Sequence, residues 1–149
     1  MRDHFAILKV GPALTFAYRE AVFALARLEN ELLPRLERSN LIDVVDQVMV
    51  RQPEHWERYY PGTPEQQSHR RKFSRSDRMR YYWAEAEVQA ALGRLFENLA
   101  GRALPLALLS QFLPEQGRHI QSGELQNDPQ AVIWDRITGV LEDYTLACA

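Results

Sequence analysis

Hydrophobic and polar positions alternate with helical spacing along most of this 149-residue chain. From residue 13 to 33 apolar residues recur every three or four positions, and the run 21–26 contains no polar residue. This pattern predicts a long helix that is covered on more than one side. Pro34 ends or kinks it. We expect the helix to become exposed to solvent near its C-terminal end, where the charged residues Arg27, Glu29, Glu31 and Arg35 lie.

Between residues 39 and 76 the pattern breaks into short pieces. Ser39 or Asn40 is suited to cap a second helix, whose apolar positions follow at once. Pro53 suits the first position of a brief helix, and Thr63 followed by proline predicts the cap of another. Such interrupted segments usually pack on a larger body and seldom fold alone.

The C-terminal half returns to longer elements. Residues 84–100 carry an apolar stripe at helical spacing, which predicts an amphipathic helix. The apolar run 104–113 has little periodicity and is expected to be buried. Gly117 and Gly123 predict an irregular stretch, and Asp128-Pro129 predicts the start of a final amphipathic helix.

Residues 5–10 depart from helical spacing. They form a short apolar run that also contains Lys9, and Gly11-Pro12 closes it. This composition predicts a strand buried on both faces, followed by a tight turn and the first helix. One strand cannot form a sheet, so we expect it to pair with another chain or the sequence to be part of a larger protein.

The strand–turn–helix junction is a candidate anion site. Free backbone N–H groups at a helix start, together with Lys9 at the strand end, suit a phosphate group. The residues concerned are Lys9, Gly11, Ala13, Leu14 and Thr15. The alternative is that Gly11-Pro12 is only a tight turn beneath a buried helix.

A basic and aromatic segment, residues 68–83, has the most unusual composition of the chain. It holds six cations and only one acid, Asp77. Three interpretations remain open: a solvated surface in which Asp77 pairs with Arg78 or Arg80, an anion or sugar-phosphate clamp, or a nucleic-acid surface. The clamp would use Arg75, Arg78 and Arg80. Tyr82 and Trp83 are expected to pack against the helix that follows.

Composition and charge limit the remaining function classes. Hydrophobic residues at 46% and charged residues at 26% are typical of a globular domain, and a net charge of −2 favours neither nucleic acid nor a membrane. The single cysteine, Cys148, excludes an internal disulfide and predicts a reducing, cytoplasmic location. No histidine pair has metal-ligand spacing and no phosphate-cradle glycine motif occurs, so we predict no metal site and no catalytic residue within this chain.

Several long blocks carry a family resemblance that covers essentially the whole chain. They are HFAILKVGPALTFAYREAVFAL, FSRSDRMRYYW, LLSQFLPEQ and SGEL. These blocks resemble the C-terminal region of the Z-type (GatZ/KbaZ) subunits of class II D-tagatose-1,6-bisphosphate aldolase. The resemblance implies a (β/α)8 barrel, a fold of about 250 residues. It implies a mainly α chain in which residues 1–38 supply the last barrel strand and its helix, and residues 39–149 a helical extension.

The resemblance also implies a function. Z-type subunits are described as non-catalytic supports for a catalytic aldolase subunit in galactitol, tagatose and N-acetylgalactosamine catabolism. The expected partners are that catalytic subunit or another copy of the chain, and a sugar phosphate is the candidate ligand. Zinc or another divalent metal would belong to the full barrel or to the partner. The alternative function is a metal-dependent ketose-phosphate 4-epimerase, and in either case Gly11 lacks a side chain that could contact the reacting sugar.

Overall fold

The computed structural model describes residues 11–148, and every regular element in this range is helical. The predominance of α structure is therefore confirmed. The predicted strand at residues 5–10, including Lys9, lies outside the described residues. The α-helices are α1 (Ala13–Leu32), α2 (Leu41–Arg51), α3 (Pro64–Phe73), α4 (Ala86–Leu99), α5 (Leu106–Phe112), α6 (Pro114–Ser122) and α7 (Pro129–Cys148). Three short 3₁₀ helices are η1 (Pro53–His55), η2 (Glu57–Tyr59) and η3 (Arg78–Tyr81).

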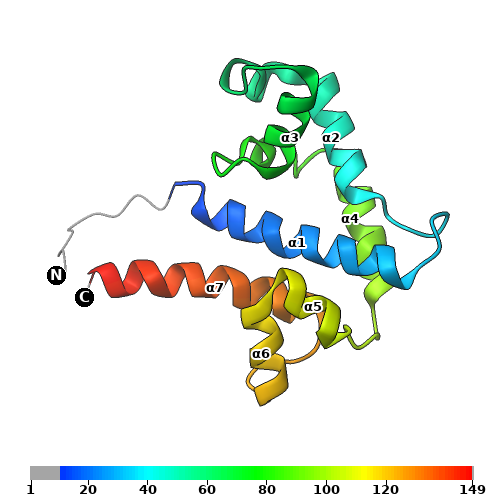
Figure 1. Cartoon of the computed structure of the whole chain (residues 1–149), viewed down its shortest axis with the longest axis vertical. Helices are drawn as coiled ribbons and strands as arrows, with labels where there is room; N and C mark the ends of the chain where they lie inside the picture. Colours follow the sequence, from blue (N-terminus) through cyan, green and yellow to red (C-terminus); the bar gives the residue numbers. More distant parts are fainter. Residues whose placement is uncertain (1–10, 149) are drawn as a thin grey trace.

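Helix α1 runs through the middle of the molecule, and α7 lies antiparallel beside it (Figure 1). Helices α2, α3 and α4 gather on one side of this pair, and α5 and α6 lie on the other (Figure 1). The side chains of residues 21–26 are all buried, as the unbroken apolar run predicted. The helix ends at Leu32 because the residue before Pro34 is pushed into extended geometry, which Leu33 adopts with φ −125° and ψ 147°.

Glu29 corrects the expectation that the last turns of α1 emerge into solvent. Its side chain is only 1% exposed. The backbone N–H of Ser39 donates to the Glu29 carboxylate at 2.9 Å, and the Ser39 hydroxyl donates at 2.6 Å. The Asn98 amide of α4 donates to it at 2.6 Å. These hydrogen bonds replace the ones that the carboxylate would make with water. Glu29 therefore links α1 to the loop at 33–40 and to α4.

In the interrupted middle of the chain, α3 packs against α2, and α2 in turn packs against α4. Thr63 forms the predicted cap of α3, a capping box with Gln66. Asn40 precedes α2 as predicted, but it has φ +51° and makes no side-chain cap, while the Ser39 hydroxyl accepts from the Leu41 N–H at 3.4 Å. Tyr82 is fully buried, which confirms its predicted packing role. The largest fully buried apolar side chains are Leu25, Leu28, Leu41, Met49, Met79, Tyr82, Leu95, Leu99, Leu104 and Leu109.

Gly117 shows where the expectation of an irregular stretch is wrong. The residue lies inside α6 and is buried, and a Cβ at its position would lie 3.4 Å from the Ser110 Cβ of α5. Gly117 therefore packs directly against Ser110 of α5. Gly123, with φ +82°, is the residue that ends α6. Helix α7 then begins at Pro129 as predicted.

Candidate functional site

Four of the predicted phosphate-binding residues lie at the start of α1: Gly11 just before the helix, and Ala13, Leu14 and Thr15 in its first turn. Gly11 has φ +50°, a backbone geometry that glycine adopts most readily, and Pro12 occupies the N-cap position without a side-chain cap. The N–H groups of Ala13, Leu14 and Thr15 precede the first helical hydrogen bond, which runs from Phe16 to the Pro12 carbonyl at 2.8 Å. No acidic residue lies in this turn. The helix start therefore presents unsatisfied donors, while the fifth predicted residue, Lys9, lies outside the described residues.

An ion pair attaches the basic segment to this end of α1. A guanidinium nitrogen of Arg19 lies 2.9 Å from the Asp77 carboxylate, and the two side chains are 3% and 0% exposed. Arg19 also donates to the Ser74 carbonyl at 2.9 Å. The interpretation that paired Asp77 with Arg78 or Arg80 is thus wrong, because the ion pair of Asp77 is with Arg19. The Asp77 side chain is fully buried, and its backbone has φ +46°.

Burial and charge act in opposite directions on this pair. Burial raises the pKa of Asp77, while the Thr15 hydroxyl and the charges of Arg19 and Arg80 act to lower it. Burial likewise lowers the pKa of Arg19, and the Asp77 charge opposes that shift. Arg19 thus holds the turn at 74–77 against the second turn of α1, through its contacts with Asp77 and Ser74.

The three arginines proposed for an anion clamp differ in the contacts that their guanidinium groups make. Arg80 donates to the carbonyls of Ser76 and Asp77 at 2.7 and 2.9 Å. The Arg78 guanidinium lies 3.3 Å from the ring centroid of Tyr59. Arg75 is exposed and makes no hydrogen bond or ion pair with residues 11–148. Of the three, Arg75 is the one whose charged group is open to an incoming anion.

The other cations of the basic segment also serve the fold. Arg71 pairs with Asp46 of α2 at 2.7 Å, and Lys72 approaches the same carboxylate at 3.5 Å. Arg70 donates to the Pro61 carbonyl at 2.6 Å. The unusual composition of this segment is thus explained largely by contacts within the molecule.

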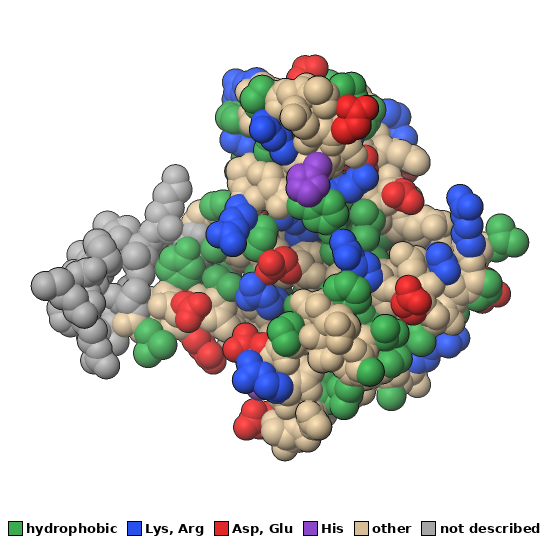
Figure 2. Space-filling view, viewed as in Figure 1, with side chains coloured by type: hydrophobic (Ala, Val, Ile, Leu, Met, Phe, Trp, Pro, Cys, Tyr) green, Lys and Arg blue, Asp and Glu red, His purple; other side chains and the backbone are tan. Residues whose placement is uncertain are grey.

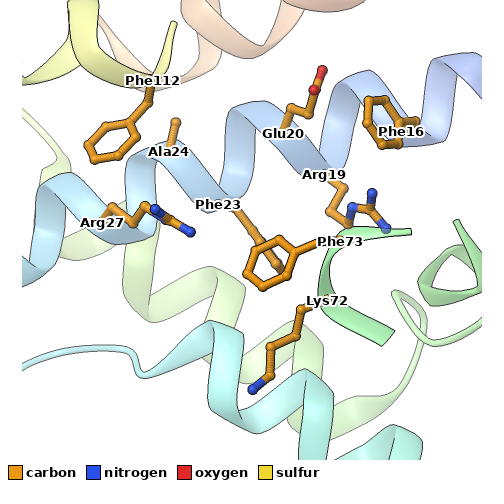
Figure 3. Close-up of a pocket in the computed structure, with 9 residues that line it drawn as sticks. All are labelled: Phe16, Arg19, Glu20, Phe23, Ala24, Arg27, Lys72, Phe73 and Phe112. Atoms are coloured by element: carbon orange, nitrogen blue, oxygen red, sulfur yellow. The ribbon is translucent and has the colours of Figure 1, made fainter. Parts of the chain in front are cut away.

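A groove opens on the face that α1, α3 and α5 share (Figure 3). Its volume is about 220 Å³. Aromatic rings and cations form most of its lining, which we call the α1–α3–α5 groove: Phe16, Phe23, Phe73, Phe112, Arg19, Arg27 and Lys72, with Ala24 and Glu20. The guanidinium of Arg27 lies 5.3 Å from the Phe112 ring centroid. Figure 2 shows cationic and hydrophobic side chains interspersed across the middle of the molecule.

A histidine–carboxylate pair joins α6 to α7. The Nδ1 atom of His119 lies 3.0 Å from the Asp135 carboxylate, and the Gln116 amide donates to the same carboxylate at 2.9 Å. In residues 11–148 no group of three side chains is placed to hold a metal ion. No helix in that range is long and apolar enough to cross a membrane.

Sequence reasoning missed Arg19, Glu29 and the His119–Asp135 pair. Arg19 and Glu29 offered one signal, because each is a charged residue beside the apolar run of α1. A charge in that position must either point outward or find a buried partner. The partners themselves could not be found, because Asp77 and Asn98 lie far along the chain.

Comparison with known proteins gives consistent matches. The family model described as "D-tagatose-1,6-bisphosphate aldolase subunit GatZ/KbaZ-like" matches residues 1–149. A relative named D-tagatose-1,6-bisphosphate aldolase subunit GatZ, from Klebsiella pneumoniae subsp. pneumoniae, is 47% identical over 100% of this chain and 35% of its own length. The GatZ subunit of an Escherichia coli O17:K52:H18 strain is also 47% identical, over 36% of its length.

A solved structure shares the fold. It is titled a probable tagatose 6 phosphate kinase from Sinorhizobium meliloti 1021, and it superposes with a TM-score of 0.91 at 41% identity. The match covers 97% of this chain and 37% of the solved one. The chain therefore spans about a third of the length of the relatives that it matches.

Proposed function

This chain belongs to the GatZ/KbaZ-like family of D-tagatose-1,6-bisphosphate aldolase subunits, and we propose that it acts as part of a non-catalytic subunit. In this proposal it supports the stability and activity of a catalytic class II aldolase subunit in the cytoplasm. The pathway would be the breakdown of galactitol, tagatose or N-acetylgalactosamine. The observation that carries the proposal is the match to GatZ subunits at 47% identity over the full length of the chain.

We also propose that the chain contributes to a (β/α)8 barrel. Residues 1–38 would supply the last strand and its helix, and residues 39–149 would form a helical extension. Helix α1 shares its core with later helices, because α7, α4 and α5 all contact it. Residue 38 would therefore mark the boundary between the barrel and the extension, but the two parts on either side of it would fold together as one unit.

The start of α1 is the proposed phosphate site. The backbone N–H groups of Gly11, Ala13, Leu14 and Thr15 would hold the phosphate oxygens, and Lys9 would supply a charge. The absence of an acid from the first turn of α1 and the anchoring of the turn at 74–77 beside Thr15 support this placement.

The three arginines of the proposed clamp would contribute unequally to this site. Arg75 would be the first to reach the anion, because its charged group is open. Arg78 and Arg80 would join only by exchanging their present contacts with Tyr59 and the backbone. In this proposal any divalent metal would be held by the rest of the barrel or by the partner.

The proposal is tested by co-expression with a catalytic class II D-tagatose-1,6-bisphosphate aldolase subunit. We expect the two polypeptides to co-purify and the aldolase activity to persist longer than that of the catalytic subunit alone. Failure to co-purify, together with an unchanged half-life, would overturn the proposal. Incubation of the chain alone with tagatose 6-phosphate and a divalent metal tests the epimerase alternative, and formation of fructose 6-phosphate would replace the present proposal.

The phosphate site has its own test. Isothermal titration with inorganic phosphate should show binding that the Lys9→Ala and Arg75→Ala variants weaken. Arg102→Ala is the matched control, because Arg102 is also exposed but lies in the loop after α4. Equal binding by all four proteins would exclude this site without affecting the proposed subunit role.

A further inference from the structure

The C-terminal end of α7 carries exposed leucines next to acidic residues. Leu141 and Leu146 are 43% and 66% exposed. Glu142 lies on the helical arc between them, and Asp143 is adjacent. Both carboxylates are exposed and make no ion pair with residues 11–148. Figure 2 shows acidic and hydrophobic side chains together at this end of the molecule, at the lower left. We call these four residues the α7 end.

The α1–α3–α5 groove has the complementary character. Two of its rings are exposed, Phe73 by 43% and Phe112 by 39%. Arg27 is exposed and has no acidic partner in the described part of the chain. Lys72, whose ammonium group approaches Asp46 at 3.5 Å, lies at the groove next to Phe73 (Figure 3). Aromatic side chains and arginine are the residues most enriched where proteins bind one another. The molecule thus bears a cationic aromatic groove and an acidic apolar helix end.

In one molecule Leu146 lies far from the part of the groove that contains Arg27. Arg136 of α7 binds Glu20 in the groove lining at 2.6 Å, which fixes the register of α7 against α1. Leu146 is ten residues beyond Arg136 in a continuous helix, so it lies about 15 Å further along α1. Because α7 is antiparallel to α1 (Figure 1), this displacement runs toward the N-terminal end of α1, whereas Arg27 lies on the C-terminal side of Glu20.

We propose that a second copy of this chain seats its α7 end in the α1–α3–α5 groove. Leu141 and Leu146 would cover Phe73 and Phe112, and the carboxylates of the α7 end would pair with the groove cations. Reciprocal exchange places two identical contacts around a twofold axis, the commonest symmetry of homo-oligomers. The proposal goes beyond the proposed function, because it requires no catalytic partner.

Sedimentation equilibrium of the full chain over a wide concentration range tests the proposal. We expect a reversible dimer whose dissociation constant rises by about tenfold or more in Arg27→Glu and in Glu142→Arg, since like charges then face each other. An equimolar mixture of the two variants should recover association, because the reversed groove then meets the reversed helix end. The matched controls are Arg102→Glu and Glu124→Arg, two exposed charges outside both surfaces.

A third variant separates association from folding. Leu146→Asp changes a side chain that is already 66% exposed, so the monomer should keep its helical circular dichroism and its unfolding midpoint. It should nevertheless fail to dimerise. A chain that stays monomeric at every concentration overturns the proposal. So does a dimer that neither charge reversal weakens, or a mixture of the two variants that does not recover.

Discussion

The buried Arg19–Asp77 pair gives the sharpest prediction about the stability of the protein. At 2.9 Å and an effective dielectric constant of about 20, the attraction is about 6 kcal/mol. Desolvation costs several kcal/mol for each ion, so the intact pair is close to neutral overall. Removal of one partner leaves the desolvation of the other uncompensated. We therefore expect a single substitution to lower the free energy of unfolding by about 3 kcal/mol.

Asp77→Asn is the most informative single change. Asparagine tolerates the φ of +46° and keeps the shape of the side chain, so the variant removes the charge and little else. Arg19→Met removes the opposite charge and keeps an apolar stem of similar length. The double variant removes both charges and should lie within about 1 kcal/mol of the original protein. Arg35→Met and Glu124→Gln are the controls, because both residues are exposed and lie outside the two surfaces of the proposed dimer.

The pH dependence distinguishes the two single variants in urea denaturation. Burial already raises the pKa of Asp77, and loss of Arg19 removes an opposing charge, so the pKa rises further in Arg19→Met. A raised folded-state pKa contributes stability that is present below about pH 4 and is lost as the pH rises through the folded value. The free energy of unfolding of Arg19→Met should therefore be closest to that of the original protein at about pH 4, and it should fall as the pH rises toward 7.

Asp77→Asn should lack the pH dependence that the titration of Asp77 gives the original protein, because asparagine does not titrate. The reasoning is refuted if Asp77→Asn loses less than about 1 kcal/mol. It is also refuted if the double variant loses the sum of the two single deficits, because the two charges would then contribute independently.

Three further predictions concern stability measured by urea denaturation. Glu29→Gln should lose about 2 kcal/mol because an amide replaces a carboxylate that accepts from several buried donors, whereas exposed Glu31→Gln should change little. Burial raises the pKa of Tyr82 to about 12 from 10.0. The free energy of unfolding should therefore fall by about 3 kcal/mol as the pH rises from about 10 to about 12. Tyr82→Phe should lack this alkaline loss, and retention of the full loss would contradict the assignment. Gly93→Ala should raise the free energy of unfolding by about 1 kcal/mol, because Gly93 lies in the middle of α4 and a Cβ there would meet nothing within 4 Å. An unchanged or lower free energy of unfolding would disprove this.

The sequence predicts helices well where periodicity and local chain chemistry agree. Pro34 and Pro129 mark the end of α1 and the start of α7, and Thr63 marks the start of α3. These signals are local, because proline geometry and capping hydrogen bonds involve residues within one turn. The same local reasoning fails at Gly117, which lies inside α6 and packs against Ser110 of the neighbouring helix α5.

The candidate site was only partly predictable for a related reason. Periodicity shows which face of a helix is apolar, but it does not identify the partner of a charged residue on that face. One of the three interpretations of the basic segment paired Asp77 with Arg78 or Arg80, because the pairing of close residues is the simplest expectation on a helix. Asp77 instead pairs with Arg19, which lies 58 residues earlier, and no periodic pattern encodes that contact.

Helix α1 links the fold to the proposed barrel. A barrel helix must leave one face open to the strands, yet residues 21–26 of α1 are covered within the described chain. The first turns are different, since residues 12–16 are only partly buried. If α1 does pack on a barrel, it must do so through this N-terminal part, which is also where the proposed phosphate site and the anchored turn at 74–77 lie. The basic segment would then sit at the junction between barrel and extension, and Arg19 and Asp77 would hold it there.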